Sequence, residues 1–251
     1  MIINWLVFSD LHLQYKNFKK VVLWEKLTNF ISGQPVEFIL IAGDCFYKYQ
    51  KGMEIESTID YIHTLCSASG CGKSNIYITP GNHDLARTEA RLNILQYYTG
   101  IDYAMGEKKG EGRNLTEEAY KLLFNEQFSE GFCEMHKNIV GKQYNSTQLI
   151  EKENYRILNI NTCMLSGGYY SGSDEKKKNL HLDEGNLSVE DDKLLNELGK
   201  IVNDEKINLV LMHHGIEYLR ENERNHFQQL MEDHYIDIVF TGHSHKIGIY
   251  T

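Results

Sequence analysis

The stretch TPGNHDLAR at residues 79–87 decides how the chain is to be interpreted, because it places asparagine, histidine and aspartate side by side directly after the apolar run NIYI. Pro80, Gly81 and Asn82 are all good turn formers. A plain turn therefore explains the tetrapeptide GNHD about as well as a functional site does. The rest of the chain separates these two interpretations.

Short apolar runs alternate with helical patterns along the chain. The runs are almost continuously apolar and rich in β-branched residues, which is typical of strands covered on both faces. Apolar residues recur at helical spacing over residues 16–32, 188–205 and 223–234. Gly33 ends the first of these segments, and Ser188 with Asp191 opens the second as a capping-box pattern. This alternation predicts an α/β domain. The strand-like runs are INWLVFS at 3–9, VEFILIAG at 36–43, NIYITP at 75–80, YRILNINT at 155–162, INLVLMHH at 207–214 and IDIVFTG at 236–242.

One segment, from about residue 102 to residue 146, interrupts the alternation. It holds the charged, glycine-rich stretch EKKGEGRN at 107–114 and one long helical pattern at 116–132, and strand patterns resume near Gln148. We predict that this segment is a cap-like insertion that shapes substrate access. The whole chain, residues 1–251, is then a single catalytic domain.

Composition limits the classes of protein that the chain can belong to. The formal net charge of -9 disfavours a broad nucleic-acid-binding face. Five cysteines without paired spacing favour a reducing compartment. The first residues lack the basic region of a signal peptide, and no run approaches the roughly 20 apolar residues that cross a bilayer. We therefore expect a cytoplasmic protein that makes no contact with membranes.

Residues of the types that bind metals follow five of the apolar runs. Because the carboxyl ends of parallel strands share one edge of a sheet, residues far apart in sequence should converge there. Each pair or triplet alone is common in turns, but five such events at strand ends are hard to ascribe to chance. The residues are Asp10, His12, Asp44, Asn82, His83, Asp84, His213, His214, His243 and His245.

The donor atoms of this set indicate which metals it would bind. Carboxylate and amide oxygens together with imidazole nitrogens suit Mn, Fe or Zn better than Ca. The set contains no thiolate, which disfavours a structural zinc site.

The ordered motifs D-x-H, GD, GNHD, H and GHSH resemble those of the calcineurin-like metallophosphoesterase superfamily, and they extend from Asp10 to His245. The resemblance implies a double β-sandwich flanked by helices, with four layers in the order α/β/β/α. It also implies a centre of two divalent ions, with Mn expected and Fe or Zn as alternatives, and it implies that Asp44 bridges them. One ion would be bound by Asp10, His12, Asp44 and His245, and the other by Asp44, Asn82, His213 and His243.

The resemblance also assigns roles to the two residues that complete GNHD. His83 would approach the leaving-group oxygen, and Asp84 would orient His83. This agrees with elementary chemistry, since two ions lower the pKa of a bridging water and provide a metal-bound hydroxide at neutral pH. A histidine beside them can then protonate the departing alkoxide. Gly81 would permit the sharp turn that presents these side chains.

The expected activity is hydrolysis of phosphodiester bonds, with nucleic acid or nucleotides as the favoured substrates. The alternatives are a phosphomonoesterase or protein phosphatase, and a metal-binding sensor or interaction module without turnover.

The chain departs from the family pattern at one position and leaves the ligand open at another. Many family members carry a second aspartate where this chain has Tyr47, so no role is transferred to that residue. In MHHG the ligand is assigned to His213, with His214 as the alternative.

Only six residues follow His245, whereas members of the superfamily usually continue with further strands. We therefore expect that the chain can be the N-terminal catalytic part of a longer protein, with an additional C-terminal domain or a protein partner.

Overall fold

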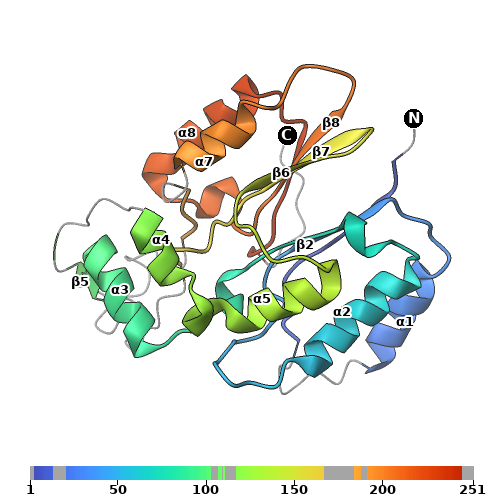
Figure 1. The fold of residues 1–251 in the computed structure, drawn as a ribbon, viewed down its shortest axis with the longest axis horizontal. Coiled ribbons are helices and arrows are strands. Elements are labelled where there is room, and N and C mark those ends of the chain that lie inside the picture. The colour runs from blue at the N-terminus through green and yellow to red at the C-terminus, as the bar shows by residue number, and fades with distance from the viewer. Residues whose placement is uncertain are drawn as a thin grey trace.

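The computed structural model describes residues 3–13, 21–102, 107–108, 110, 117–166, 184–187 and 191–244. Within these ranges the chain forms three β-sheets, of which the two larger ones pack face to face, and helices cover both outer faces of this pair (Figure 1). The predicted four-layer α/β/β/α sandwich is thus confirmed.

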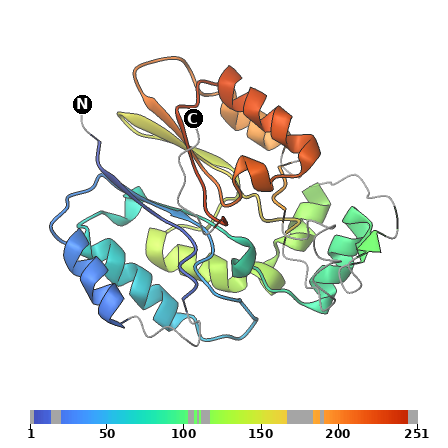
Figure 2. The same ribbon diagram turned by 180° about the vertical axis from the view of Figure 1, so that it is seen from behind.

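The first sheet is fully parallel, in the order β1 (Trp5–Phe8), β2 (Phe38–Ala42) and β3 (Ile76–Thr79). Its outer face is covered by α1 (Val21–Ile31), α2 (Glu56–Ala68) and α5 (Glu126–Val140), which lie along one side of the molecule in both views (Figures 1 and 2).

The second sheet has the order β6 (Gln148–Glu151), β7 (Tyr155–Asn159), β8 (Ile207–Leu211) and β9 (Ile238–Phe240). β6 runs antiparallel to β7, whereas β7, β8 and β9 are parallel to one another. Helices α7 (Asp191–Leu198) and α8 (Glu221–Asp233) cover its outer face on the opposite side of the molecule (Figure 1).

Successive side chains of a strand point to opposite faces of the sheet, and in β2 both faces are covered. This explains why its run is apolar throughout. In β2, Phe38 and Leu40 point into the space between the sheets, while Ile39 and Ile41 point towards the helices. In β8, Leu209 faces the other sheet in the same way. A strand buried on both faces needs apolar residues at every position, and this is the pattern that the sequence shows.

Hydrogen bonds connect the two sheets close to the carboxyl ends of their strands. The Thr79 hydroxyl donates to the Ile160 carbonyl over 2.9 Å, and the Asn159 side-chain amide donates to the Ile78 carbonyl over 2.9 Å. These bonds bring the carboxyl ends of β3 and β7 to one common edge.

The predicted cap-like segment at residues 102–146 divides into two structurally different parts. Phe132, Met135 and Ile139 of α5 belong to the core beneath the first sheet, so α5 is part of the helical layer. The remaining described elements lie to one side of the sandwich together with α3 (Glu89–Thr99), on the left of Figure 1. They are β4 (Ile101–Asp102), β5 (Glu107–Lys108) and α4 (Glu117–Leu123).

The single helix predicted at 116–132 is wrong, because the chain forms two helices there. α4 ends at Leu123 and α5 begins at Glu126. Asn125 caps α5, since its side-chain oxygen accepts a hydrogen bond from the Gln127 amide over 2.9 Å.

None of the helices in the described part of the chain has the length and apolar composition that a membrane-spanning helix needs.

Candidate metal centre

The ends of β1 and β2 lie side by side because the strand pairing continues past the strands. The Asp10 amide donates to the Gly43 carbonyl over 3.0 Å, and the His12 amide donates to the Asp44 carbonyl over 2.9 Å. Asp10, His12 and Asp44 therefore lie close together, as predicted from their positions at strand ends.

The backbone at this edge adopts an uncommon conformation. Five non-glycine residues in the described part of the chain have φ in the left-handed region, and four of them are predicted ligands: Asp10 (52°), His12 (44°), Asp44 (54°) and His243 (68°). The left-handed region costs free energy for residues that carry a Cβ, so it persists where surrounding structure enforces it, and such residues concentrate at functional sites.

Asp44 lies at the centre of the site and is 1% exposed. Its Oδ1 accepts a hydrogen bond from the His83 amide over 2.8 Å. Its Oδ2 is 3.5 Å from His213 Nε2 and 3.9 Å from His12 Nε2. One carboxylate oxygen thus faces histidines that come from both sheets.

His213 approaches Asn82 with its ring held in a defined orientation. The distance from His213 Nε2 to Asn82 Oδ1 is 3.0 Å, and Nδ1 lies 2.7 Å from the Ala42 carbonyl oxygen. A carbonyl only accepts, so Nδ1 donates to it, and Nε2 is the ring nitrogen that faces Asp44 and Asn82. A histidine ligand whose other nitrogen donates to a carbonyl is the usual arrangement in metal sites.

His243 reaches the same place from the end of β9. Its Nδ1 is 3.3 Å from Asn82 Oδ1, and its backbone amide donates to Asp10 Oδ2 over 3.0 Å. By contrast, His214 Nδ1 lies 2.9 Å from the hydroxyl of Thr162. Of the two histidines in MHHG, His213 is therefore the one beside Asp44 and Asn82. Residue 245 lies outside the described residues.

Three overlapping groups of side chains in the described part of the chain can bind a cation. In each group the donor atoms lie within 4.8 Å of one another. Two of the groups share Asp44, and the donors are carboxylate oxygens and imidazole nitrogens, which fit a divalent transition metal. The groups are Asp10, Asp44 and His213; His12, Asp44 and His83; and His213, His214 and His243.

The contacts of Asp84 differ from those predicted. Its Oδ1 accepts from the Phe46 amide over 2.9 Å, and its Oδ2 accepts from the Gly81 amide over 2.8 Å. It therefore holds the GNHD turn against the end of β2 and makes no hydrogen bond to His83. The His83 Nδ1 instead contacts the Tyr47 carbonyl oxygen. Burial, followed by the nearby Asp44 carboxylate, raises the pKa of Asp84 to about 7.

Gly81 is required for a reason other than the predicted turn. Its φ of -99° and ψ of 173° are ordinary extended values. However, a Cβ at this position would overlap the carboxylate and the backbone nitrogen of Asp44. The glycine is needed because the GNHD backbone passes directly against Asp44.

Replacing Gly81 by alanine should lower metal affinity and kcat/KM by roughly 10–100-fold, the usual cost of disturbing groups that orient metal ligands. Metal titration and kinetics measure the effect. Gly33→Ala is the matched control, because nothing lies within 4 Å of a Cβ there and its φ is not positive. Equal behaviour of the two variants would contradict the assignment.

Several groups around the site could not be identified from sequence. Two are backbone carbonyls, of Ala42 and Tyr47, whose role depends on how the elements pack. A third is Thr162, which follows β7 and contacts His214 through its hydroxyl. The Tyr218 ring packs edge to face against His243, with centroids 4.7 Å apart.

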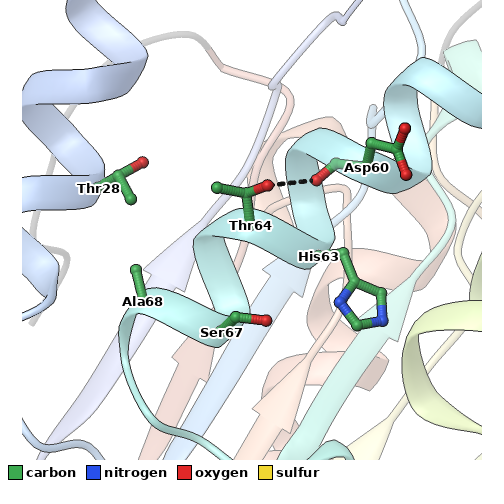
Figure 3. A pocket seen from close by; sticks show the side chains of 6 residues that line it. All are labelled: Thr28, Asp60, His63, Thr64, Ser67 and Ala68. Carbon is green, nitrogen blue, oxygen red and sulfur yellow. Dashed lines mark hydrogen bonds between the residues drawn. The ribbon is translucent and has the colours of Figure 1, made fainter.

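A separate hollow lies on the surface of α1 and α2, and none of the predicted ligands lines it (Figure 3). Thr28 lines it from α1, and the other lining residues belong to α2. It contains one imidazole, of His63, and one carboxylate, of Asp60, so it offers a poorer set of metal donors than the strand edge does.

Comparison with known proteins agrees with the geometry. The model of the family described as calcineurin-like phosphoesterase matches residues 3–247. The chain is also 28% identical, over 259 aligned positions, to the uncharacterized metallophosphoesterase-like protein YydB of Bacillus subtilis (strain 168). That alignment covers 98% of this chain and 49% of YydB, so the chain spans about half the length of this relative. The chain belongs to the calcineurin-like phosphoesterase family.

Proposed function

We propose that the protein is a phosphodiesterase that uses two divalent ions, with Mn as the native metal. The observation that supports this most directly is the position of Asp44, whose carboxylate lies between His12 and His213 and belongs to two of the candidate ligand groups. A carboxylate shared by two cation sites is what a pair of closely spaced ions requires.

The resemblance to the superfamily supplies the ligand assignment in this proposal. One ion would be held by Asp10, His12, Asp44 and His245, and the second would be held by Asp44, Asn82, His213 and His243. When bound, the ions supply positive charge to the phosphate oxygens and lower the pKa of water.

The protein's own residues then position the substrate and the proton. His83 stands beside the proposed ligands, with its ring held by the Tyr47 carbonyl. We assign it the transfer of a proton to the leaving-group oxygen. Asp84 acts as a positioning residue, since its two oxygens fix the GNHD turn through the Gly81 and Phe46 amides.

Phosphodiesters, including nucleic acid and nucleotides, are the proposed substrates. Family membership supports phosphoester hydrolysis in general, and the combination of GNHD with GHSH resembles nucleases and cyclic-nucleotide phosphodiesterases as much as it resembles phosphatases. The net charge of -9 argues against binding through a broad basic face. Recognition at the catalytic site itself, by metals and neighbouring side chains, is compatible with this charge.

Hydrolysis of bis-p-nitrophenyl phosphate and of p-nitrophenyl phosphate tests this proposal. Protein that has been freed of metal by chelation should be inactive, and added Mn should restore the activity. We expect kcat/KM for the diester to exceed that for the monoester by at least about tenfold, which is 1.4 kcal/mol in the activation free energy.

Two outcomes would contradict the proposal in different ways. A preference for the monoester would identify a phosphomonoesterase. Binding of two ions without turnover of either compound would identify a metal-binding sensor or interaction module.

We further propose that the protein is located in the cytoplasm. The five cysteines are all free thiols, which supports a reducing, cytoplasmic environment. An additional C-terminal domain or a protein partner is part of this proposal, and the chain spans about half the length of YydB.

A further inference from the structure

Tyr47 is an exposed aromatic residue that directly follows a buried stretch, residues 41–46. Its side chain is 41% exposed, whereas Cys45 and Phe46 before it are fully buried and Tyr49 after it is 3% exposed. The Tyr47 ring lies close to two histidines of the candidate metal centre, where it could contact a bound substrate.

The backbone of Tyr47 is fixed on two sides. Its amide donates to the Leu13 carbonyl over 3.1 Å, and its carbonyl oxygen contacts His83 Nδ1. The neighbouring Phe46 forms a β-bridge with Leu13. The ring is therefore attached to a rigid part of the molecule, beside the histidine that is proposed to act on the leaving group.

The Tyr47 ring also has a defined relation to two imidazoles of the site. Its centroid is 5.9 Å from that of His12 and 6.1 Å from that of His83. The ring planes are inclined at 77° and 40°, respectively, so neither imidazole stacks in parallel on the tyrosine. The ring therefore lies beside His12, a proposed metal ligand, and beside His83, to which we assign the leaving group.

We propose that Tyr47 is a specificity-determining residue that stacks against the base of the leaving nucleoside. The inference rests on the proposed phosphodiesterase function and names its substrate class: phosphodiesters whose leaving alcohol carries an aromatic base. Base–aromatic stacking tolerates any sequence, because every base has a π face. It also requires no basic surface, which agrees with the acidic composition of the chain.

Matched dinucleotides test this proposal. Thymidylyl-thymidine is compared with two analogues, each of which carries an abasic residue on one side of the phosphate, and the products identify the leaving side. Tyr47→Leu should raise KM about tenfold for the substrate with both bases, within the range measured for loss of one stacked base. Its kcat should stay within about twofold. On the analogue that lacks the leaving-side base, variant and wild type should agree within about twofold.

Two variants serve as controls. Tyr47→Phe keeps the ring and should retain the wild-type KM. Phe30→Leu removes another exposed ring, which is 70% exposed on α1, and should change nothing. A separate binding readout uses 2-aminopurine as the leaving-side base. Its fluorescence should be quenched on mixing with excess wild type or Tyr47→Phe, before hydrolysis, and should not be quenched by Tyr47→Leu.

The possible failures can be distinguished. Equal losses on base-bearing and abasic substrates would show that Tyr47 only supports His83, which overturns the stacking role and leaves the proposed function intact. Hydrolysis of bis-p-nitrophenyl phosphate without hydrolysis of any dinucleotide would overturn the substrate class. Inactivity of the metal-loaded wild type on every diester would overturn the phosphodiesterase function itself.

Discussion

Replacing Asp44 by asparagine should remove bound metal and lower kcat/KM for bis-p-nitrophenyl phosphate by roughly 10³-fold or more. The carboxylate lies between His12 and His213, so loss of its charge leaves two cations without the anion that offsets their mutual repulsion. The charge stabilisation that metals give a phosphoryl transition state is worth several kcal/mol, and each 1.36 kcal/mol is tenfold in rate.

The asparagine variant should still fold. Its side-chain oxygen can accept the hydrogen bond that the His83 amide donates to Asp44 Oδ1. Metal analysis of the dialysed protein, kinetics and thermal unfolding are measured together. Asp60→Asn, in an exposed position on α2, makes the same chemical change away from the site and should behave as wild type (Figure 3). Two ions bound at wild-type affinity by Asp44→Asn would refute the bridging role.

Replacing His83 by alanine should lower activity by about 10²–10⁴-fold on a phosphodiester with an alkyl leaving group, the usual contribution of general acid catalysis. The loss on an aryl diester should be much smaller, because p-nitrophenolate leaves without being protonated. The metal content should remain at two ions. Both expectations follow from assigning His83 to the leaving group rather than to a metal.

This prediction decides between two roles that the geometry allows, since His83 also forms a candidate ligand group with His12 and Asp44. If His83 binds a metal, the alanine variant will lose an ion and its rate will fall equally on both substrates. His63→Ala, on α2 and beside the hollow of Figure 3, is the matched control and should lose neither metal nor activity.

The strands and the strand-end residues were predictable because each is specified locally. Apolar runs identified β1, β2, β3, β7, β8 and β9, and the residues that closely follow β1, β2, β3, β8 and β9 gave the predicted ligands. Parallel strands then bring their ends to a common edge. The resemblance to known metallophosphoesterases added the two-sheet arrangement, which periodicity alone does not indicate.

Among the described residues, two helices were not anticipated, and α3 shows the physical reason. The face that it buries consists of Arg91, Leu95 and Thr99, so only one of the three is apolar. Arg91 is fully buried because its guanidinium donates to the carbonyls of Met164 and Ser166, each over 3.0 Å. A helix that packs through an arginine and distant carbonyls carries no hydrophobic pattern to detect. The second helix, α2, buries Thr58 and Cys66 together with Ile62 and Leu65, which weakens its apolar stripe.

The contacts that hold the site could not be predicted for a related reason. The Ala42 carbonyl meets His213 only after the two sheets have packed, and the Tyr47 carbonyl meets His83 only after β2 and β3 have paired. Both acceptors are backbone carbonyls, which every residue has. Composition and spacing therefore cannot predict either contact.

The hydrogen bond from the His243 amide to Asp10 joins residues that are 233 positions apart, and it lies inside the proposed metal centre. During synthesis on the ribosome, Asp10 leaves the exit tunnel long before His243 does. A nascent chain can therefore complete the first sheet and still lack three of the seven proposed ligands. On the proposed ligand assignment, hydrolysis requires β9, the last strand in the described part of the chain, to have joined the second sheet, so a truncated or half-folded copy would not act as an unregulated hydrolase.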